Sequence, residues 1–222
     1  MKEAVFQLGK KLLKEKRKKK KIKIKKKKGT KKTRCSNEAC CTLKRRLGIL
    51  KKMFKLCLVT DRNQVPKDKD ITDVVKESVK AGIDAVCVRE KDLSDLELYN
   101  LAKKIKQITQ KKCYFLVNGR SDIAASVDAD GVHLPSASVP LRFARKVIGN
   151  KKIIGVSCHS IFDAKKAYND GADYVFLGPI FWTMSKAKYG NPLGLDIIKK
   201  VKEKIKIPVI TIGGIKDWNV SG

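Results

Sequence analysis

The sequence lacks any long apolar stretch, although 42% of its 222 residues are hydrophobic. No window approaches the roughly 18 apolar residues that a membrane-spanning helix needs, and the first residues lack the apolar core and cleavage site of a signal peptide. Disulfide and zinc patterns are also missing. Of the seven cysteines, three stand near the N-terminus at spacings that match no common zinc site, and four stand singly in apolar runs. We therefore expect no membrane span and a reducing, cytoplasmic location.

Acidic residues are scarce, with 22 Asp and Glu against 52 Lys and Arg and a formal net charge of +30. Residues 1–52 hold 23 of the basic and 3 of the acidic side chains, and no aromatic residue stands between the charges of residues 16–28 to stack on bases. Because a like-charged block repels itself and buries little apolar surface, we expect 1–52 to be a disordered tail, or translated sequence upstream of a start at Met53. Binding of this tail to nucleic acid or an anionic surface is a further alternative.

From residue 53 onward, apolar runs alternate with segments of helical periodicity. Seven strands are predicted, at residues 54–61, 85–90, 113–118, 130–135, 152–159, 174–181 and 207–215. Six helices are predicted between them, at residues 71–82, 94–108, 121–127, 139–149, 160–171 and 195–205. Ser94, Ser121 and Ser160 are expected to cap three of these helices. The strands are continuous apolar runs, which indicates a parallel sheet that is covered on both faces.

Strand and helix alternating in this way favour an α/β fold of the TIM (β/α)₈-barrel type over an open, doubly wound sheet. The barrel domain is expected to cover residues 53–222. No segment before residue 222 is predicted to form an eighth strand, so we expect a barrel that is incomplete at its C-terminus, through truncation or imperfect closure. An open parallel barrel would expose two unpaired strand edges.

Polar residues gather at the carboxyl ends of the predicted strands, where barrel enzymes build their sites. Arg89 and Lys91 stand two positions apart at one strand end, and a guanidinium fork beside an ammonium group suits phosphate or pyrophosphate. An exposed rim that binds nothing is the alternative. The loop after the sixth strand carries Thr183, Ser185 and Lys186, and we expect it to wrap a phosphorylated ligand.

Two further groups stand at strand ends. Gly213 and Gly214 follow the seventh strand and would let backbone N–H groups approach a phosphate. His159 ends the fifth strand, two positions after Ser157, and a histidine at a barrel mouth is a natural general acid or base near neutral pH. His133 ends the fourth strand, where a structural role is equally compatible with the pattern.

Six motifs together resemble one known family. They are VREK (88–91), VNGR (117–120), ADGVHLP (129–135), IIGVSCHS (153–160), GADYVFLGPIFWTMSK (171–186) and IPVITIGGI (207–215). In this order they resemble the thiamine-phosphate synthase/TenI superfamily over about residues 54–220. The resemblance implies a (β/α)₈ barrel, a thiazole phosphate as substrate and a place in thiamine biosynthesis. It adds Asn118 to the candidate pyrophosphate contacts Arg89 and Lys91, and it makes Ser157 a candidate substrate contact.

The superfamily has two branches. Its synthases join a pyrimidine pyrophosphate to a thiazole phosphate with Mg²⁺, whereas its TenI-type tautomerases move a proton on a carboxythiazole phosphate without a metal. Synthases usually carry Mg²⁺-binding aspartates where this chain has Gly119 and Ser138, and neither residue can supply that charge. Cys87 also stands where synthases often carry a glutamine.

These departures favour the tautomerase branch, with His159 as the acid/base residue and no cofactor. Two alternatives stay open. The first is a synthase that uses Mg²⁺, because Lys186 and its hydroxyl neighbours are more complete than a tautomerase requires. The second is a non-catalytic barrel that the basic tail tethers to a partner. Association into a homo-oligomer is left open.

Overall fold

The computed structural model describes residues 54–184, 190–216 and 218–220. The basic segment 1–52 lies outside the described residues, as do Ser185 and Lys186 of the predicted phosphate loop. The expected tail and its boundary with the barrel domain therefore stay predictions.

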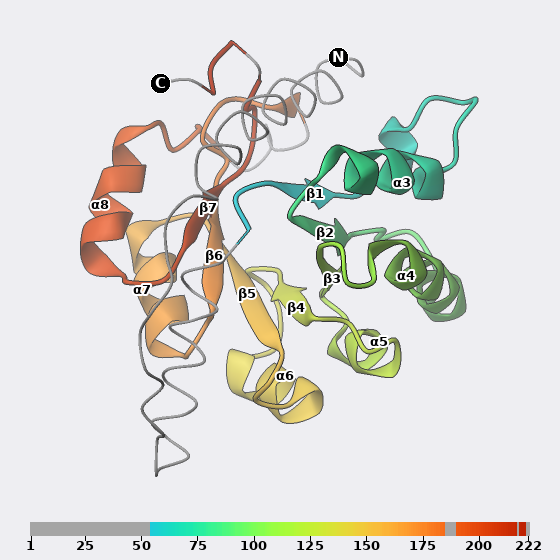
Figure 1. The fold of residues 1–222 in the computed structure, drawn as a ribbon. Helices are drawn as coiled ribbons and strands as arrows, with labels where there is room; N and C mark the ends of the chain where they lie inside the picture. Colours follow the sequence, from blue (N-terminus) through green and yellow to red (C-terminus); the bar gives the residue numbers. More distant parts are fainter. Residues whose placement is uncertain (1–53, 185–189, 217, 221–222) are drawn as a thin grey trace, which may run out of the picture.

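Seven strands alternate with helices along the described chain (Figure 1). The strands are β1 Cys57–Val59, β2 Ala85–Val88, β3 Tyr114–Asn118, β4 Gly131–Leu134, β5 Ile153–Cys158, β6 Tyr174–Leu177 and β7 Val209–Thr211. The helices are the 3₁₀ turn η1 Arg62–Gln64, then α3 Ile71–Ala81, α4 Asp95–Thr109, α5 Ser121–Ser126, α6 Leu141–Ile148, α7 Ile161–Asn169 and α8 Asp196–Lys204. Every predicted strand and helix is thus confirmed, with ends that differ by a few residues.

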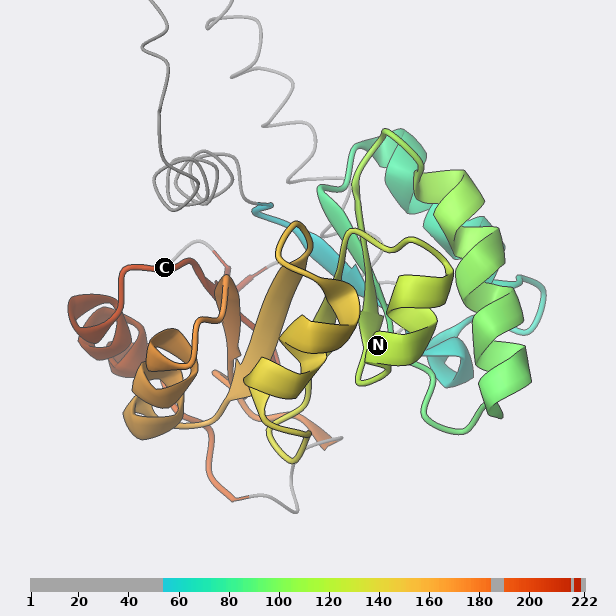
Figure 2. The same cartoon turned by 90° about the horizontal axis from the view of Figure 1, so that it is seen from below.

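All strands pair in parallel and lie in chain order from β1 to β7. An order without reversal places every helix on the same, outer side of the curved sheet, as the view from below shows (Figure 2). The predicted barrel-type α/β fold is therefore confirmed. Within the described residues β1 and β7 each pair with one neighbour, so the sheet curls without closing on itself.

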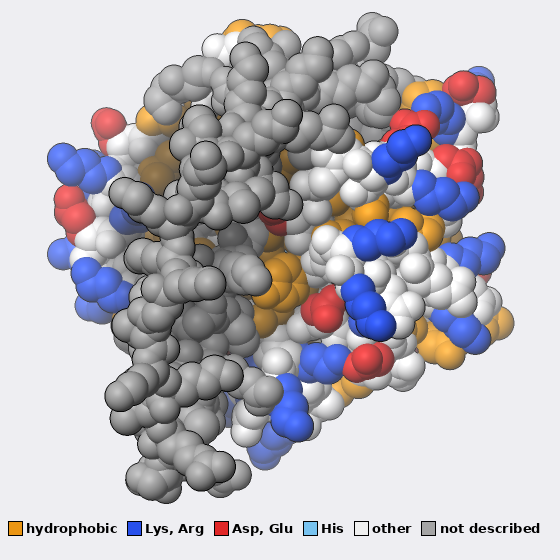
Figure 3. Space-filling model, viewed as in Figure 1, with side chains coloured by type: hydrophobic (Ala, Val, Ile, Leu, Met, Phe, Trp, Pro, Cys, Tyr) orange, Lys and Arg blue, Asp and Glu red, His pale blue; other side chains and the backbone are white. Residues whose placement is uncertain are grey.

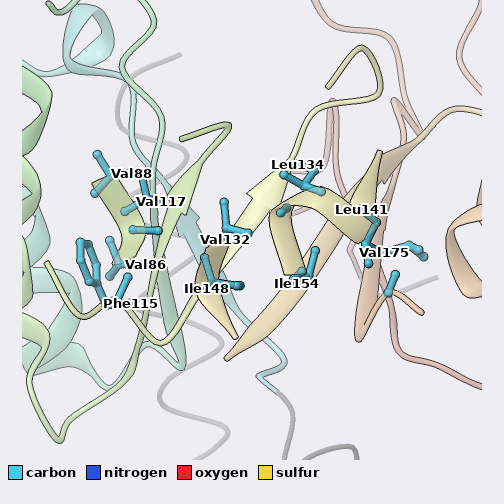
Figure 4. Close-up of a cluster of buried hydrophobic side chains, with 14 of the residues drawn as sticks. Val86, Val88, Phe115, Val117, Val132, Leu134, Leu141, Ile148, Ile154 and Val175 are labelled. Atoms are coloured by element: carbon cyan, nitrogen blue, oxygen red, sulfur yellow. The ribbon is translucent and has the colours of Figure 1, made fainter. Parts of the chain in front are cut away.

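Alternation along the strands produces two apolar layers. The outward-facing side chains pack against the helices in a cluster that includes Val86, Val117, Val132 and Ile154 (Figure 4). The inward-facing side chains form a smaller cluster inside the curl of the sheet, made of Phe54, Ala85, Cys87, Leu116, Ile153, Tyr174 and Phe176. Both faces of the sheet are covered, which explains why the strands read as continuous apolar runs.

Local signals explain where the helices begin. Ser94 and Glu97 form a reciprocal capping box at the start of α4, and the Ser160 side chain accepts from the backbone N–H of Asp163 at the start of α7, as predicted. The predicted cap at Ser121 is wrong. The left-handed turn already ends at Gly119, so Arg120 takes the N-cap position and Ser121 becomes the first helical residue.

The outer surface carries both signs of charge. Lys and Arg side chains are interspersed with Asp and Glu around α3 (Figure 3), where Lys69 pairs with Glu77 and Lys76 with Asp73. In the part of the chain that the structure describes, no helix combines the length and apolar character needed to cross a membrane. The four cysteines of this part have free thiols.

Candidate functional site

A pocket of about 270 Å³ opens at the carboxyl ends of the strands. Every one of the seven strands or the residues that follow it contributes to its wall, as the fold predicts. The lining residues are Val59, Thr60, Asp61, Gln64, Cys87, Arg89, Asn118, His133, Ser157, His159, Phe176, Gly178, Pro179, Thr183, Ile212 and Gly213. Apolar walls with a few polar groups are typical of a small-molecule site.

Arg89 gives the pocket a positive charge. Its backbone N–H donates to the buried Thr60 hydroxyl at 2.9 Å, which holds the end of β2 against the end of β1. Among the described arginines, three pair with aspartates and Arg142 lies over the Phe143 ring. The Arg89 guanidinium has no such partner within the described residues. A half-buried guanidinium that lines a pocket and has no acidic partner among the described residues is suited to an anionic ligand.

The segment Asn118-Gly119-Arg120 divides between the pocket and the surface. Asn118 ends β3 and lines the pocket. Gly119 turns the chain with a φ of +74°, and its N–H donates to the His133 carbonyl at 2.8 Å. Arg120 leaves the pocket and pairs with Asp95 and Asp122 on the outer surface.

His133 and its partners form the floor of the pocket. The His133 ring is almost fully buried and lies against Phe176, with ring centroids 4.2 Å apart. Its Nδ1 is 3.1 Å from the hydroxyl of Tyr174, and its Nε2 is 2.9 Å from Oγ of Ser157. Burial lowers the pKa of His133 from 6.5 to about 3, so the ring is neutral near pH 7. Burial also raises the pKa of the Cys87 thiol to about 12, which keeps this pocket residue protonated.

Strand register explains how these side chains meet. His133 of β4 pairs with Gly155 of β5, and Gly155 pairs with Tyr174 of β6. All three therefore occupy one row across the inner face of the sheet. A Cβ atom on Gly155 would lie 1.9 Å from Cζ of Tyr174, so only a glycine at this position leaves space for the tyrosine ring. The absence of this one side chain lets His133 and Tyr174 reach each other across β5.

His159 and Gly213 line the pocket from the ends of β5 and β7. His159 Nδ1 lies 2.5 Å from the Gly178 carbonyl. Because a carbonyl oxygen only accepts, Nδ1 carries a proton, and in the neutral ring this leaves Nε2 as the acceptor. Gly213 has a φ of +96°, and a Cβ there would lie 2.6 Å from Pro179. A glycine is therefore required where the chain after β7 passes the chain after β6.

Most of the predicted site residues meet in this pocket, namely Arg89, Asn118, Ser157, His159, Thr183 and Gly213. Lys91 does not line it. The strand ends at Val88, so the alternation that should align Lys91 with Arg89 stops early, and Lys91 is exposed in a turn. Gly214 is adjacent to the pocket but is not part of its lining, and Ser185 and Lys186 lie outside the described residues.

Several residues of the pocket were missed from the sequence, including Gln64 and Phe176, as was the buried Tyr174 that contacts His133. Gln64 lines the pocket because the 3₁₀ turn after β1 folds inward, with the Gln64 amide donating to Asp61 at 2.7 Å. The polar run after the first strand could have indicated this turn. Tyr174 and Phe176 stand inside a continuous apolar strand. Only the alternation of side chains along β6, together with the register from β4 through β5 to β6, assigns them to the inner face.

The sequence matches the thiamine monophosphate synthase family, TMP-TENI, over residues 56–222. It is 40% identical over 167 residues to a thiamine-phosphate synthase of Clostridium novyi, which covers 75% of this chain and 81% of that protein. It is 42% identical over 169 residues to a thiamine-phosphate synthase of Clostridium acetobutylicum, which covers 76% and 79%.

Solved structures agree with the fold. The thiamine phosphate pyrophosphorylase from Pyrococcus furiosus superposes with a TM-score of 0.65 at 36% identity, covering 73% of this chain and 76% of that one. The N-acetylmannosamine-6-phosphate 2-epimerase from Clostridium perfringens superposes with a TM-score of 0.51 at 13% identity over 84% of both chains. At that identity the second likeness shows the fold alone.

These comparisons overturn one expectation. The prediction that the main activity is that of a thiazole tautomerase is wrong, because the relatives near 40% identity are thiamine-phosphate synthases. These relatives favour the alternative, a thiamine-phosphate synthase. The prediction gave two positions, Gly119 and Ser138, more weight than the rest of the matched chain.

Proposed function

The chain belongs to the thiamine monophosphate synthase family, and on that premise we propose that it is a thiamine-phosphate synthase, a transferase of thiamine biosynthesis. Its substrates would be a hydroxymethylpyrimidine pyrophosphate and a thiazole phosphate. The observation that carries the proposal is the Arg89 guanidinium, which faces the pocket without an acidic partner among the described residues. A pyrophosphate is the anion that this substrate pair brings to such a group.

The pyrophosphate would bind between the ends of β2 and β3. Arg89 offers a charged fork there, and Asn118 at the neighbouring strand end offers an amide. Lys91 is exposed and long enough to reach outward-facing oxygens, and it stays a candidate contact from the solvent side. The pyrimidine ring would then lie against the apolar wall that includes Cys87 and Phe176.

The thiazole phosphate would bind on the other side of the pocket, at the ends of β6 and β7. Gly213 has its backbone in the left-handed region beside Pro179, and a turn of this kind exposes N–H groups to a phosphate. Thr183 lines the same side. The remaining candidates for this phosphate, Ser185, Lys186 and Gly214, stay predictions.

The reaction replaces pyrophosphate by the thiazole ring nitrogen on the methylene carbon of the pyrimidine. A C–N bond forms as the C–O bond breaks, and the leaving pyrophosphate takes the bonding electron pair. Arg89 would stabilise the charge that grows on this leaving group, in a pocket whose apolar walls strengthen the interaction. His159 lines the same pocket and would lie beside the thiazole phosphate.

Synthases of this superfamily use Mg²⁺, and the side chains that line the pocket decide whether it can hold this cation. Its lining includes one carboxylate, Asp61, whose oxygens already accept from the Asn63 N–H and the Gln64 amide. Glu90 is buried outside the lining, where it accepts from the Arg62 N–H. No group of three or more His, Cys, Asp or Glu side chains that could hold a metal occurs within the described residues. The donor set therefore does not fit a carboxylate-held Mg²⁺, and we assign no step to a metal.

The proposal is tested by incubating the full chain with both substrates, with and without Mg²⁺, and measuring thiamine phosphate and pyrophosphate. Arg89→Ala should lower kcat/KM for the pyrimidine pyrophosphate by about 10- to 100-fold, since hydrogen bonds to charged groups contribute roughly 1.5–3 kcal/mol. Arg89→Lys should recover part of this loss, because it restores the charge without the fork.

Arg142→Ala is the matched control, because Arg142 is an exposed arginine on α6 that lies over Phe143. It should leave the rate unchanged. Failure of the wild-type chain to form thiamine phosphate under either condition would refute the proposed function. Equal rates for Arg89→Ala and Arg142→Ala would refute the assignment of the pyrophosphate to Arg89.

A further inference from the structure

Tyr174 is a fully buried polar residue of the inner cluster that does not line the pocket. Its hydroxyl lies 3.1 Å from Nδ1 of His133, and the opposite nitrogen of the same ring lies 2.9 Å from Oγ of Ser157. Ser157 does line the pocket. The three side chains thus form a chain of hydrogen bonds from the interior of the sheet to the ligand-binding surface.

The direction of this chain follows from counting protons. Burial raises the pKa of Tyr174 well above its ordinary value, so its hydroxyl keeps its proton. Within the described residues, the single hydrogen-bond partner of this hydroxyl is His133 Nδ1. If Nδ1 carried a proton as well, the tyrosine proton would be buried without an acceptor, which is destabilising. Tyr174 therefore donates, and Nδ1 accepts.

The remaining assignments follow. A neutral imidazole has one N–H, so with Nδ1 as the acceptor the proton of His133 is on Nε2. Nε2–H then donates to Oγ of Ser157, and Ser157 must direct its own proton elsewhere. No other hydrogen bond of the Ser157 hydroxyl is found within the described residues, so the proton is available to the pocket.

We propose that Tyr174 is a positioning residue, which sets the tautomer of His133 and thereby makes Ser157 a hydrogen-bond donor to the bound substrate. The acceptor is a lone pair of the substrate, on a ring nitrogen or on a phosphate oxygen. Gly155 is required for this arrangement, because a Cβ at this position would collide with the Tyr174 ring. The inference deepens the proposed function and rests on it for the identity of the substrate.

The tautomer can be observed without any activity. The chain has two histidines, so ¹⁵N-labelled protein gives two sets of imidazole signals, and the set that disappears in His159→Asn belongs to His159. We expect His133 to carry its proton on Nε2 in the wild type and to become a mixture of tautomers in Tyr174→Phe. A wild-type ring that is protonated on Nδ1 would overturn the proposal.

Kinetics of the full chain then separate positioning from packing. Ser157→Ala and Tyr174→Phe should each lower kcat/KM by about two- to tenfold, the range of one ordinary hydrogen bond. The double variant should be no slower than Ser157→Ala alone, because Tyr174 acts through Ser157. Losses that multiply would show a separate structural effect of Tyr174 and would overturn the proposal, as would an unchanged rate for Tyr174→Phe.

Tyr114→Phe is the matched control. Tyr114 packs on the same inner cluster, and its hydroxyl has no hydrogen-bond partner in the described part of the chain, so its rate and the His133 signals should not change. If the wild type forms no thiamine phosphate, the proposed function fails by itself. The tautomer measurement then supports or overturns the hydrogen-bond direction independently.

Discussion

The burial of His133 leads us to expect that the protein loses stability in mild acid. The folded protein holds this ring neutral, with a pKa of about 3, whereas an unfolded chain binds a proton near pH 6.5. Below pH 6.5 the unfolded state therefore carries a proton that the folded state does not, and this favours unfolding. The contribution of His133 to stability is fully present above pH 6.5 and is lost as the pH falls toward 3.

The magnitude follows from the two pKa values. At pH 5 an unperturbed histidine is almost fully protonated, and the linkage costs about 2 kcal/mol, against roughly 0.2 kcal/mol at pH 7. The difference at pH 5 changes little if the pKa in the folded state is one unit higher. Between pH 5 and 7 Tyr174 and Cys87 do not contribute, since burial raises the pKa of both.

The assay is urea unfolding of the full chain at several pH values between 5 and 7, compared with His133→Gln. The variant will differ in absolute stability because it changes the contacts with Ser157 and Tyr174. Its pH slope is the informative quantity, because glutamine does not titrate and all other groups cancel. We expect the wild type to lose about 2 kcal/mol more than the variant over this range. Parallel curves would refute the claim that His133 is held neutral by burial.

Two further predictions concern the packing at Gly155 and the binding of Mg²⁺. Gly155→Ala should destabilise the fold by about 1–3 kcal/mol in urea unfolding, the usual cost of overpacking. Adding Tyr174→Leu should remove part of that cost, and strictly additive losses would contradict the clash. Mg²⁺ alone should bind the wild-type chain too weakly for calorimetry at sub-millimolar concentration, whereas Gly119→Asp with Ser138→Asp should bind it measurably. Position 119 has space for a Cβ, 3.7 Å from Pro135, and aspartate tolerates positive φ better than most residues. Tight binding to the wild type would contradict the claim that the side chains of the pocket do not fit Mg²⁺.

The sequence was sufficient for the order and type of the strands and helices. Parallel strands covered on both faces leave a strong apolar signal, and the polar residues after each strand indicated the end of the sheet that carries the pocket. Arg89, Asn118 and His159 could be predicted because each stands directly at a strand end. Lys91 could not be judged in this way, because the strand stops at Val88 and the turn that follows breaks the alternation.

The residues that escaped prediction are those whose role depends on neighbouring strands. Tyr174 reads as one apolar strand residue among several, and Gly155 as a weak point in a strand. Their meaning depends on the pairing of His133 with Gly155 and of Gly155 with Tyr174, which the order of strands alone does not specify.

The choice between activities failed for a related reason. The tautomerase prediction depends on Gly119 and Ser138, because each stands where a synthase usually has a carboxylate. A pocket, however, binds its ligand through all of its groups together. The Arg89 guanidinium, which has no acidic partner in the described part of the chain, and the glycine turn at Gly213 lie in the same pocket. Both suit phosphate groups without a metal ligand from the protein. The absence of the two carboxylates therefore indicates how the charge of a bound pyrophosphate is neutralised. It says much less about whether a pyrophosphate is bound.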